Sequence, residues 1–413
     1  MRAWTIAALV AVISALPGQR AEAQELLEDD ELAALRSAAE AEAAQDIPEE
    51  EEAPTTEFKS GGLALQALNP EISVTGDMLG TFRTGDEAQQ DWSFAFRGLG
   101  IHLEAYLDPY SRFKAAFPVF AGGTTLGEAY YTRYGALAGG NLTLGKFRQQ
   151  FGVVNRWHKH GLDYVDFPLP LREVFGDGGL NQTGISADWS GQIGGTSQEL
   201  TVQLTNGENA NLFGGNADGH ASTLAHYKLY RDLSDSTYME LGVSGLSGWN
   251  DTWNVGGTDV IDSMPTAVYG FDCSILWEPT DRMRYRNVEW RAEFYYVDRQ
   301  MQAPDGSGPD VLNAWGAYTS LQMKVSRTVD VGLRYDYYQP DAEGYASGLL
   351  PLASDQEGAH RWLAAFYLTW WQSPFVKYRI QCEHEDGRDM GETEDRIVLQ
   401  CVFAAGPHKH ERY

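Results

Sequence analysis

The segment Val376-Lys-Tyr-Arg-Ile-Gln-Cys-Glu-His384 is the clearest example of alternation in the chain. Apolar residues occupy every second position from Val376 to Cys382, and polar or charged residues occupy the positions between them. Successive side chains of a β-strand point to opposite faces. The segment is therefore predicted to be a strand with one apolar face and one charged face.

The same alternation recurs along the chain from Glu71 onward. We count sixteen such segments, which start near residues 71, 91, 111, 125, 140, 180, 198, 221, 236, 265, 287, 313, 329, 359, 375 and 394. A tilted strand needs ~9–11 residues to cross a bilayer, whereas soluble strands are commonly about five or six residues long. Because many of the segments reach the longer range, we predict an all-β fold, a transmembrane antiparallel β-barrel of about sixteen strands.

Two further patterns favour a membrane barrel over a soluble sheet. Tryptophans lie near segment ends, where the aromatic girdles of a membrane barrel belong, and they are Trp92, Trp189, Trp277, Trp290, Trp315, Trp362, Trp370 and Trp371. Tight turns rich in Pro, Gly, Asp or Ser alternate with longer connections, mostly at 148–179, 207–220, 249–264, 299–312 and 339–358. This asymmetry is typical of barrels in the bacterial outer membrane, and an even strand number places both termini on the periplasmic side.

The N-terminal part differs from the rest of the chain. Arg2 precedes a short apolar run, and Ala21-Glu-Ala23 fits a small-x-small cleavage site. We predict a signal peptide at 1–23, an acidic helical and then disordered periplasmic segment at 24–65, and the barrel at 66–413. Residues 24–57 hold thirteen acidic residues and one basic residue. A small coiled coil between subunits is the alternative for this segment.

Charge and cysteine content exclude some classes of protein. The net charge of −27 argues against nucleic acid as a partner, because phosphate binding needs a basic face. The three cysteines do not suggest a disulfide framework. Cys382 and Cys401 fall in the last hairpin, where two lipid-facing thiols are expected and a cross-strand disulfide is the alternative.

The longest connection, 148–179, is rich in aromatic and charged residues, and a loop of this length is rarely free in solution. We expect it to fold into the lumen and to narrow the channel. Its predicted constriction residues are Arg156, His158, Lys159, His160, Asp163, Asp166, Arg172 and Glu173. The strand residues predicted to line the pore are Arg112, Lys114, Glu289, Arg291, Glu293, Arg334, Asp336, Lys377 and Arg379. Mixed charges in such a wall would sort permeant ions.

These features predict a passive diffusion channel for small polar or ionic solutes, with no cofactor and no enzymatic activity. One alternative is a substrate-specific channel or zinc-uptake receptor, because His158 and His160 form an HxH half-site that Asp163 or Asp166 could complete. Another alternative is a non-conducting structural or adhesion barrel. Strand histidines such as His102 and His226 lie at no spacing that singles out a hydrolase.

A resemblance to a known family supports the channel interpretation. The run Leu142-Thr-Leu-Gly-Lys-Phe-Arg148, followed by Gln149-Gln-Phe-Gly152, resembles the "GKF…FG" stretch of phosphate-selective-type porins. The chain looks like an uncharacterised branch of that group, whose members are sometimes labelled zinc-regulated or TonB-dependent receptors. The resemblance implies a sixteen-stranded homotrimer. We expect the barrel to lie in outer-membrane lipid after insertion by the barrel-assembly machinery, with Phe403 or Tyr413 as the terminal aromatic residue that this machinery recognises.

The chain departs from this family in two ways. Phosphate-selective porins line the pore with arginines and lysines. Here the nine strand residues named above and five more predicted to face inward, Glu240, Asp272, Lys324, Asp330 and Glu383, make fourteen, and seven of these are acidic. No plug domain is expected within the leader, because about 35 residues are too few to fold into one. These departures argue against phosphate selectivity and against active TonB-dependent uptake.

Overall fold

The computed structural model describes residues 70–85, 91–213, 220–255, 258–280, 285–302, 309–340, 360–388 and 392–406. The predicted signal peptide, the acidic segment 24–65 and Tyr413 lie outside the described residues. Within those ranges, no helix is long and apolar enough to cross a membrane.

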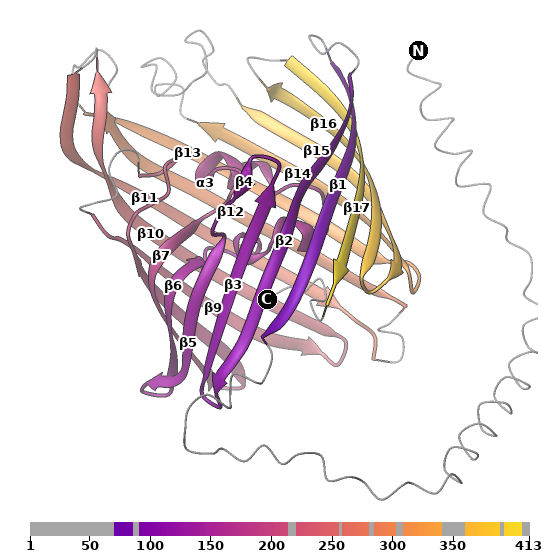
Figure 1. The fold of residues 1–413 in the computed structure, drawn as a ribbon, viewed down its shortest axis with the longest axis horizontal. Helices are drawn as coiled ribbons and strands as arrows, with labels where there is room; N and C mark the ends of the chain where they lie inside the picture. Colours follow the sequence, from indigo (N-terminus) through magenta and orange to yellow (C-terminus); the bar gives the residue numbers. More distant parts are fainter. Residues whose placement is uncertain are drawn as a thin grey trace, which may run out of the picture. The chain divides into compact units, whose positions relative to one another are not determined.

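One closed antiparallel sheet contains all the strands of the described ranges (Figure 1). The strands are β1 (Glu71–Gly85), β2 (Asp91–Asp108), β3 (Ser111–Phe120), β4 (Gly123–Thr124), β5 (Glu128–Leu137), β6 (Gly140–Arg148), β7 (Asn181–Ile193), β8 (Thr196–Thr205), β9 (Ser222–Ser234), β10 (Thr237–Val255), β11 (Thr258–Trp277), β12 (Asn287–Gln302), β13 (Pro309–Lys324), β14 (Val329–Pro340), β15 (Arg361–Ser373), β16 (Val376–Arg388) and β17 (Glu392–Ala405). The short β4 and then β5 both pair with β3, so they share one place in the wall. Because β1 pairs with both β2 and β17, the sheet closes into a barrel of sixteen strands.

This barrel confirms the predicted fold, and most strands begin within three residues of the predicted positions. The predicted connections 249–264 and 299–312 are wrong in extent. Strands β10 and β11 stay paired as far as Val255 and Thr258, and β12 and β13 stay paired as far as Gln302 and Pro309. A hairpin that extends beyond a bilayer is wet on both faces, so it keeps its hydrogen-bond ladder without apolar alternation. Periodicity therefore underestimates its length.

The two faces of the wall differ as the alternation predicts. On β14, Leu333 and Tyr335 are 55% and 45% exposed, whereas Arg334 and Asp336 are buried on the inner face. Large apolar side chains are exposed on the outer face of most other strands, for example Leu204, Val243, Phe271, Phe294, Leu321, Phe366 and Leu399. An apolar exterior around a polar interior is the arrangement of a barrel that spans a bilayer.

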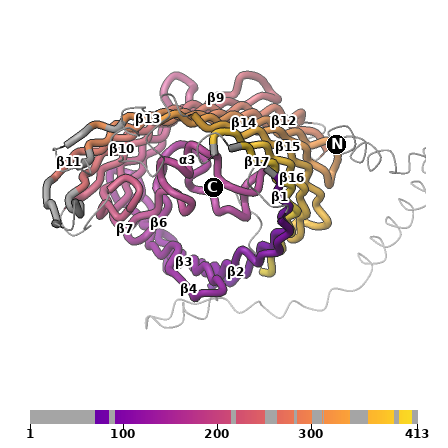
Figure 2. The backbone as a smooth tube through the Cα atoms, turned by 90° about the horizontal axis from the view of Figure 1, so that it is seen from above, coloured from indigo at the N-terminus to yellow at the C-terminus, as the bar shows by residue number. Residues whose placement is uncertain are grey.

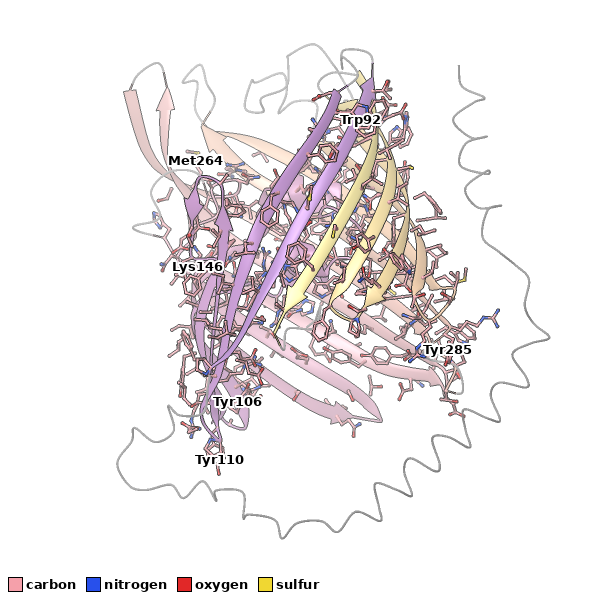
Figure 3. All side chains as sticks on the ribbon, turned by 45° about the vertical axis from the view of Figure 1, so that its right-hand side comes forward. Trp92, Tyr106, Tyr110, Lys146, Met264 and Tyr285 are labelled. Atoms are coloured by element: carbon pink, nitrogen blue, oxygen red, sulfur yellow. The ribbon has the colours of Figure 1, made fainter. Side chains whose placement is uncertain are left out.

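Aromatic residues mark both ends of the wall. Figure 3 places Trp92 at one end, and Tyr106 and Tyr110 at the other. Trp371 departs from the predicted girdle: its Nε1 donates to Asp330 Oδ2 at 2.6 Å, and Lys377 Nζ lies over its ring. Since Asp330 and Lys377 belong to the buried inner face, Trp371 faces the lumen.

The cysteines are free thiols. The register of the last hairpin places Cys382 opposite Ile397 and Cys401 opposite Tyr378. The two thiols are therefore not cross-strand partners, and the alternative of a disulfide between them is wrong. The sequence located the centre of the hairpin too loosely to fix this register.

Candidate functional site

Residues 149–180, called the lumen segment below, connect β6 to β7 and fold inside the ring of strands (Figure 2). The segment contains η2 (Val154–Arg156), η3 (Lys159–Gly161) and α3 (Leu169–Phe175). The helix α3 begins after Pro168 and ends before Gly176, whose φ is 84°. The buried side chains of the whole lumen segment form one apolar cluster with inner-face residues of the wall. The cluster includes Phe151, Trp157, Leu162, Tyr164, Phe167, Leu169, Phe175, Leu224, Leu246, Val268, Tyr295, Tyr318 and Tyr367.

Glu293 on β12 holds the start of the lumen segment. Its Oε1 accepts hydrogen bonds from the backbone N–H groups of Val153 and Val154 at 3.2 and 3.0 Å. The hydroxyls of Tyr295 and Tyr318 donate to the same carboxylate at 2.6 and 2.8 Å. Four donors thus satisfy one buried carboxylate, which removes most of the penalty for burying it.

Glycines make room for this contact. Gly152 has a φ of 58°, and a Cβ there would lie 2.2 Å from Glu293 Oε2. On the wall, a Cβ at Gly270 would lie 2.5 Å from Cε1 of Phe151. Glycine is therefore required at both positions, at the first for its backbone conformation and at both for space.

Asp166 holds the middle of the lumen segment. Its carboxylate lies 2.9 Å from Arg97 Nη1 and 3.0 Å from Arg396 Nη2, and Arg97 also pairs with Asp77. Burial by itself raises the pKa of Asp166, but Arg396 and Arg97 outweigh burial and hold that pKa below its ordinary value. Asp166 therefore stays ionised and joins β2 and β17 to the segment.

Other cations of the wall bind backbone carbonyls and aromatic rings of the segment. Lys377 and Arg379 donate to the carbonyl oxygen of Leu162 at 3.3 and 2.8 Å. The guanidinium of Arg334 lies 4.3 Å from the ring centre of Tyr164, and that of Arg291 lies 4.4 Å from Trp157. These contacts are cation–π interactions, which strengthen when water is excluded.

The inner faces of β2 and β10–β17 carry these contacts, and we call them the anchor wall. It also contains Asp336, which accepts from the backbone N–H of Leu169 at 2.9 Å, and Arg361, which pairs with Glu173. Asp163 lies 3.7 Å from Arg291, which also pairs with Glu289. The anchor wall thus contains seven of the strand residues predicted to line the pore: Glu289, Arg291, Glu293, Arg334, Asp336, Lys377 and Arg379.

The opposite inner face, formed by β3 and β5–β8, borders open space, and we call it the cavity wall. A cavity of about 190 Å³ lies against it, here called the strand-side cavity, and is lined by residues that include Arg112, Tyr130, Tyr134, Arg156, Asp188 and Glu199. A second cavity of about 760 Å³, the segment-side cavity, lies between the lumen segment and β1–β3, β5 and β6; its lining includes Asp77, Arg97, His102, Lys146, His158, Lys159 and His160. Glu128 and Arg148 border both cavities.

Three histidines gather in the segment-side cavity. The ring centre of His102 lies 5.1 Å from that of His158 and 5.5 Å from that of His160, and the latter two are 5.4 Å apart. His158 Nε2 lies 2.9 Å from Glu128 Oε2. Sequence reasoning paired His158 with His160 but missed His102 and Glu128, because nothing local links β2 and β5 to this segment.

The carboxylates suggested as companions of this HxH pair lie elsewhere, beside Arg291 for Asp163 and beside Arg97 and Arg396 for Asp166. Among the described residues, no three His, Cys, Asp or Glu side chains are grouped so that they could hold a metal ion. Zinc binding by His158 and His160 stays a prediction.

The other residues predicted to line or narrow the pore contact different parts of the barrel and of the lumen segment. Lys114 is buried on β3, and its charge faces Glu128 and Glu104. Arg156 donates to Gln150 Oε1 at 2.8 Å, and Lys159 Nζ lies 5.9 Å from the ring centre of Phe167. Arg172 lies in α3, where its backbone N–H bonds to Pro168.

No protein-family model matches this chain. An uncharacterized protein of Aquifex aeolicus (strain VF5) is 23% identical over 326 residues, which cover 75% of this chain and 67% of that protein. Among solved structures, the anion-selective porin from Comamonas acidovorans is 12% identical with a TM-score of 0.54, over 81% of this chain and 98% of that one. The chain has the fold of the outer-membrane porins.

Two further structures agree with that statement. The outer membrane channel DcaP of Acinetobacter baumannii is 11% identical with a TM-score of 0.53, over 82% of this chain and 98% of that chain. OprB of Pseudomonas putida is 12% identical with the same TM-score, over 82% and 94%. With its apolar exterior, this porin-type barrel belongs in the bacterial outer membrane.

Proposed function

We propose that the protein is a passive diffusion channel for small polar or ionic solutes, and that the lumen segment narrows its pore. The observation that carries the proposal is the position of residues 149–180, which are anchored to the inner face of the barrel and leave two cavities beside them. Both cavities are lined by cations and carboxylates, so the channel would act through size and electric field. The proposal assigns no enzymatic activity and no cofactor to the chain.

The mixed charges guide the proposed selectivity. The strand-side cavity presents Arg112, Arg148 and Arg156 together with Glu128, Asp188 and Glu199. A balanced set of this kind favours neither phosphate nor another multivalent anion. We therefore propose that the resemblance of residues 142–152 to phosphate-selective porins reflects common ancestry and not a shared substrate.

We also propose that the channel is a homotrimer. The solved structure of OmpT of Vibrio cholerae in its trimer form is 11% identical, with a TM-score of 0.51, over 82% of this chain and all of that one. The large apolar side chains exposed on the outer face would contact lipid or neighbouring subunits. Chemical crosslinking in native membranes tests the subunit number, and a ladder that ends at the monomer would contradict the trimer.

The decisive experiment is single-channel conductance of the purified protein in a planar bilayer. Deleting residues 156–173 removes most of the lumen segment and should raise conductance severalfold. Heat-modifiable migration in electrophoresis checks that each variant is a folded barrel. An unchanged conductance would reject narrowing by the segment, and a folded wild-type barrel that never conducts would reject the channel and favour a structural or adhesion role.

A further inference from the structure

The hydrogen-bond ladder of the barrel wall is interrupted between β5 and β6. The ladder ends at the pair Ala129 and Lys146, because β6 then leads into the lumen segment. Residues 123–127 continue beside β3 instead. The side chain of Asn181 on β7 crosses this place, where its Nδ2 donates to the carbonyl oxygen of Gly127 at 2.6 Å. Side-chain contacts therefore replace the backbone ladder here, and we call the place the wall gap.

The segment-side cavity extends from the lumen to the wall gap. Its lining includes the inner-face residue Asp77 and, at the gap, Leu126 and Lys146. Lys146 belongs to the outer face, because side chains alternate along a strand and it shares its face with Leu144, which is 40% exposed. Figure 3 shows Lys146 on the flank of the barrel, between the two ends of the wall. The cavity therefore connects the lumen with the lipid-facing side.

Lys146 has a charge that the wall does not balance. Among the described residues it forms no hydrogen bond and no ion pair. Carboxylates of the same cavity have other partners: Asp77 pairs with Arg97, and Glu208 accepts from the backbone N–H and the hydroxyl of Thr183 at 3.2 Å each. A lysine on the lipid face of a barrel is unfavourable unless its ammonium group reaches water or an anion. The cavity beside Lys146 has room for such an anion.

The same cavity has an apolar surface beside the wall gap. Phe120 and Leu126, where the chain turns from β3 to β5, are 48% and 46% exposed and line the cavity with Phe117 and Pro118. Large apolar side chains exposed in a cavity are stabilised by contact with an apolar ligand. The volume of about 760 Å³ is that of a pocket for a drug-sized molecule, and a two-chain phospholipid is larger.

We propose that the wall gap binds a free long-chain carboxylate, an amphiphile of the fatty-acid class. Its carboxylate pairs with Lys146, and its aliphatic chain lies along Phe120 and Leu126. Because both parts line one cavity, a single molecule balances the charge and covers the apolar surface. The cavity also gives such a molecule a route between the lumen and the bilayer. Binding at this site does not require that the barrel conduct ions.

The test is photo-crosslinking of a diazirine-bearing dodecanoate to the full-length protein in lipid nanodiscs, with mass spectrometry to locate the adducts. Adducts should concentrate at residues 117–127. Unlabelled dodecanoate should compete with the probe. Dodecanol at the same mole fraction in the bilayer should compete about tenfold more weakly, because it lacks the charge that strengthens the contact with Lys146.

Matched variants separate the two parts of the site. Lys146→Gln should reduce labelling about tenfold, whereas Lys146→Arg keeps the charge and should label as the wild type does. Arg133→Gln is the control for charge, because Arg133 is an exposed cation of β5 that lies 3.6 Å from Asp108 and lines neither cavity. Leu126→Asn should also weaken labelling. Leu137→Asn, at an exposed leucine of β5 outside both cavities, should not.

Each contrary result has a distinct meaning. Adducts scattered over the outer face would overturn the site, because simple partition into the bilayer would explain them. Equal competition by dodecanoate and dodecanol, or unchanged labelling of Lys146→Gln, would overturn the carboxylate as the group recognised. Displacement of the probe by phosphatidylglycerol but not by dodecanoate would replace the free carboxylate by a membrane phospholipid. All of these results leave the channel function standing, which conductance tests separately.

Discussion

The anchor wall and the cavity wall share one barrel and one alternating pattern, but their charged side chains do different things. On the anchor wall, Glu293, Asp336 and Arg379 bind the backbone of the lumen segment. On the cavity wall, Arg112 and Glu199 border open space. An inward-pointing charge in this barrel therefore either binds the lumen segment or borders a cavity, depending on what lies across the lumen.

The largest effect is expected when Glu293 of the anchor wall is replaced. In Glu293→Ala, the backbone N–H groups of Val153 and Val154 and two tyrosine hydroxyls lose their acceptor. A buried group left without a partner costs about 1–3 kcal/mol, so we expect docking of the segment to weaken by at least about 3 kcal/mol. Conductance and trypsin cleavage after Arg156, Lys159 or Arg172 should both increase.

The control for Glu293 is Asp272→Asn on the neighbouring strand. Asp272 is also a buried inner-face acid, but within the described ranges its oxygens have no hydrogen-bond partner. It should leave conductance and protease resistance unchanged. Wild-type behaviour of Glu293→Ala would show that the anchor wall does not hold the segment.

A smaller effect is expected from Gly270→Ala. The added methyl group would lie 2.5 Å from a ring carbon of Phe151, so the ring and the start of the segment must move. Overpacking of this kind costs about 1–3 kcal/mol. The current through the open channel should fluctuate more, and the thermal unfolding temperature should fall.

Gly245→Ala on β10 is the matched substitution, because a Cβ there would meet no atom within 4 Å. Its unfolding temperature should equal that of the wild type. Equal losses in the two variants would mean that backbone effects, and not contact with Phe151, explain the result.

The smallest effect is expected at the rim of the anchor wall. Arg361 pairs with Glu173 of α3 and with Glu385, but its side chain is 18% exposed and that of Glu173 is 30% exposed. Ion pairs of this kind contribute about 0–1 kcal/mol because water and salt screen them. Arg361→Gln should therefore conduct as the wild type does. A conductance as high as that of Glu293→Ala would mean that the rim contacts hold the lumen segment as firmly as those of Glu293 do.

Some of the site was predictable and some was not. Positions such as Arg334 and Lys377 were placed on the inner face because the period of two assigns every second residue of a strand to one side. Arg97 and Glu128 were missed, since they lie in the second and fourth segments, where glycines and short strands weaken the alternation. His102 was recognised as a strand residue, but its neighbours come from a segment more than fifty positions away.

The barrel, the strand number and the facing of side chains on the regularly alternating strands could be read from the amino-acid pattern, because they follow from local alternation and from the length needed to cross a bilayer. Which inward charges bind the lumen segment and which border the cavities is visible only in the folded barrel. That division depends on where residues 149–180 pack across the lumen. Such packing rests on contacts between residues far apart in the chain, such as Val165 with Gln381, which no local pattern records.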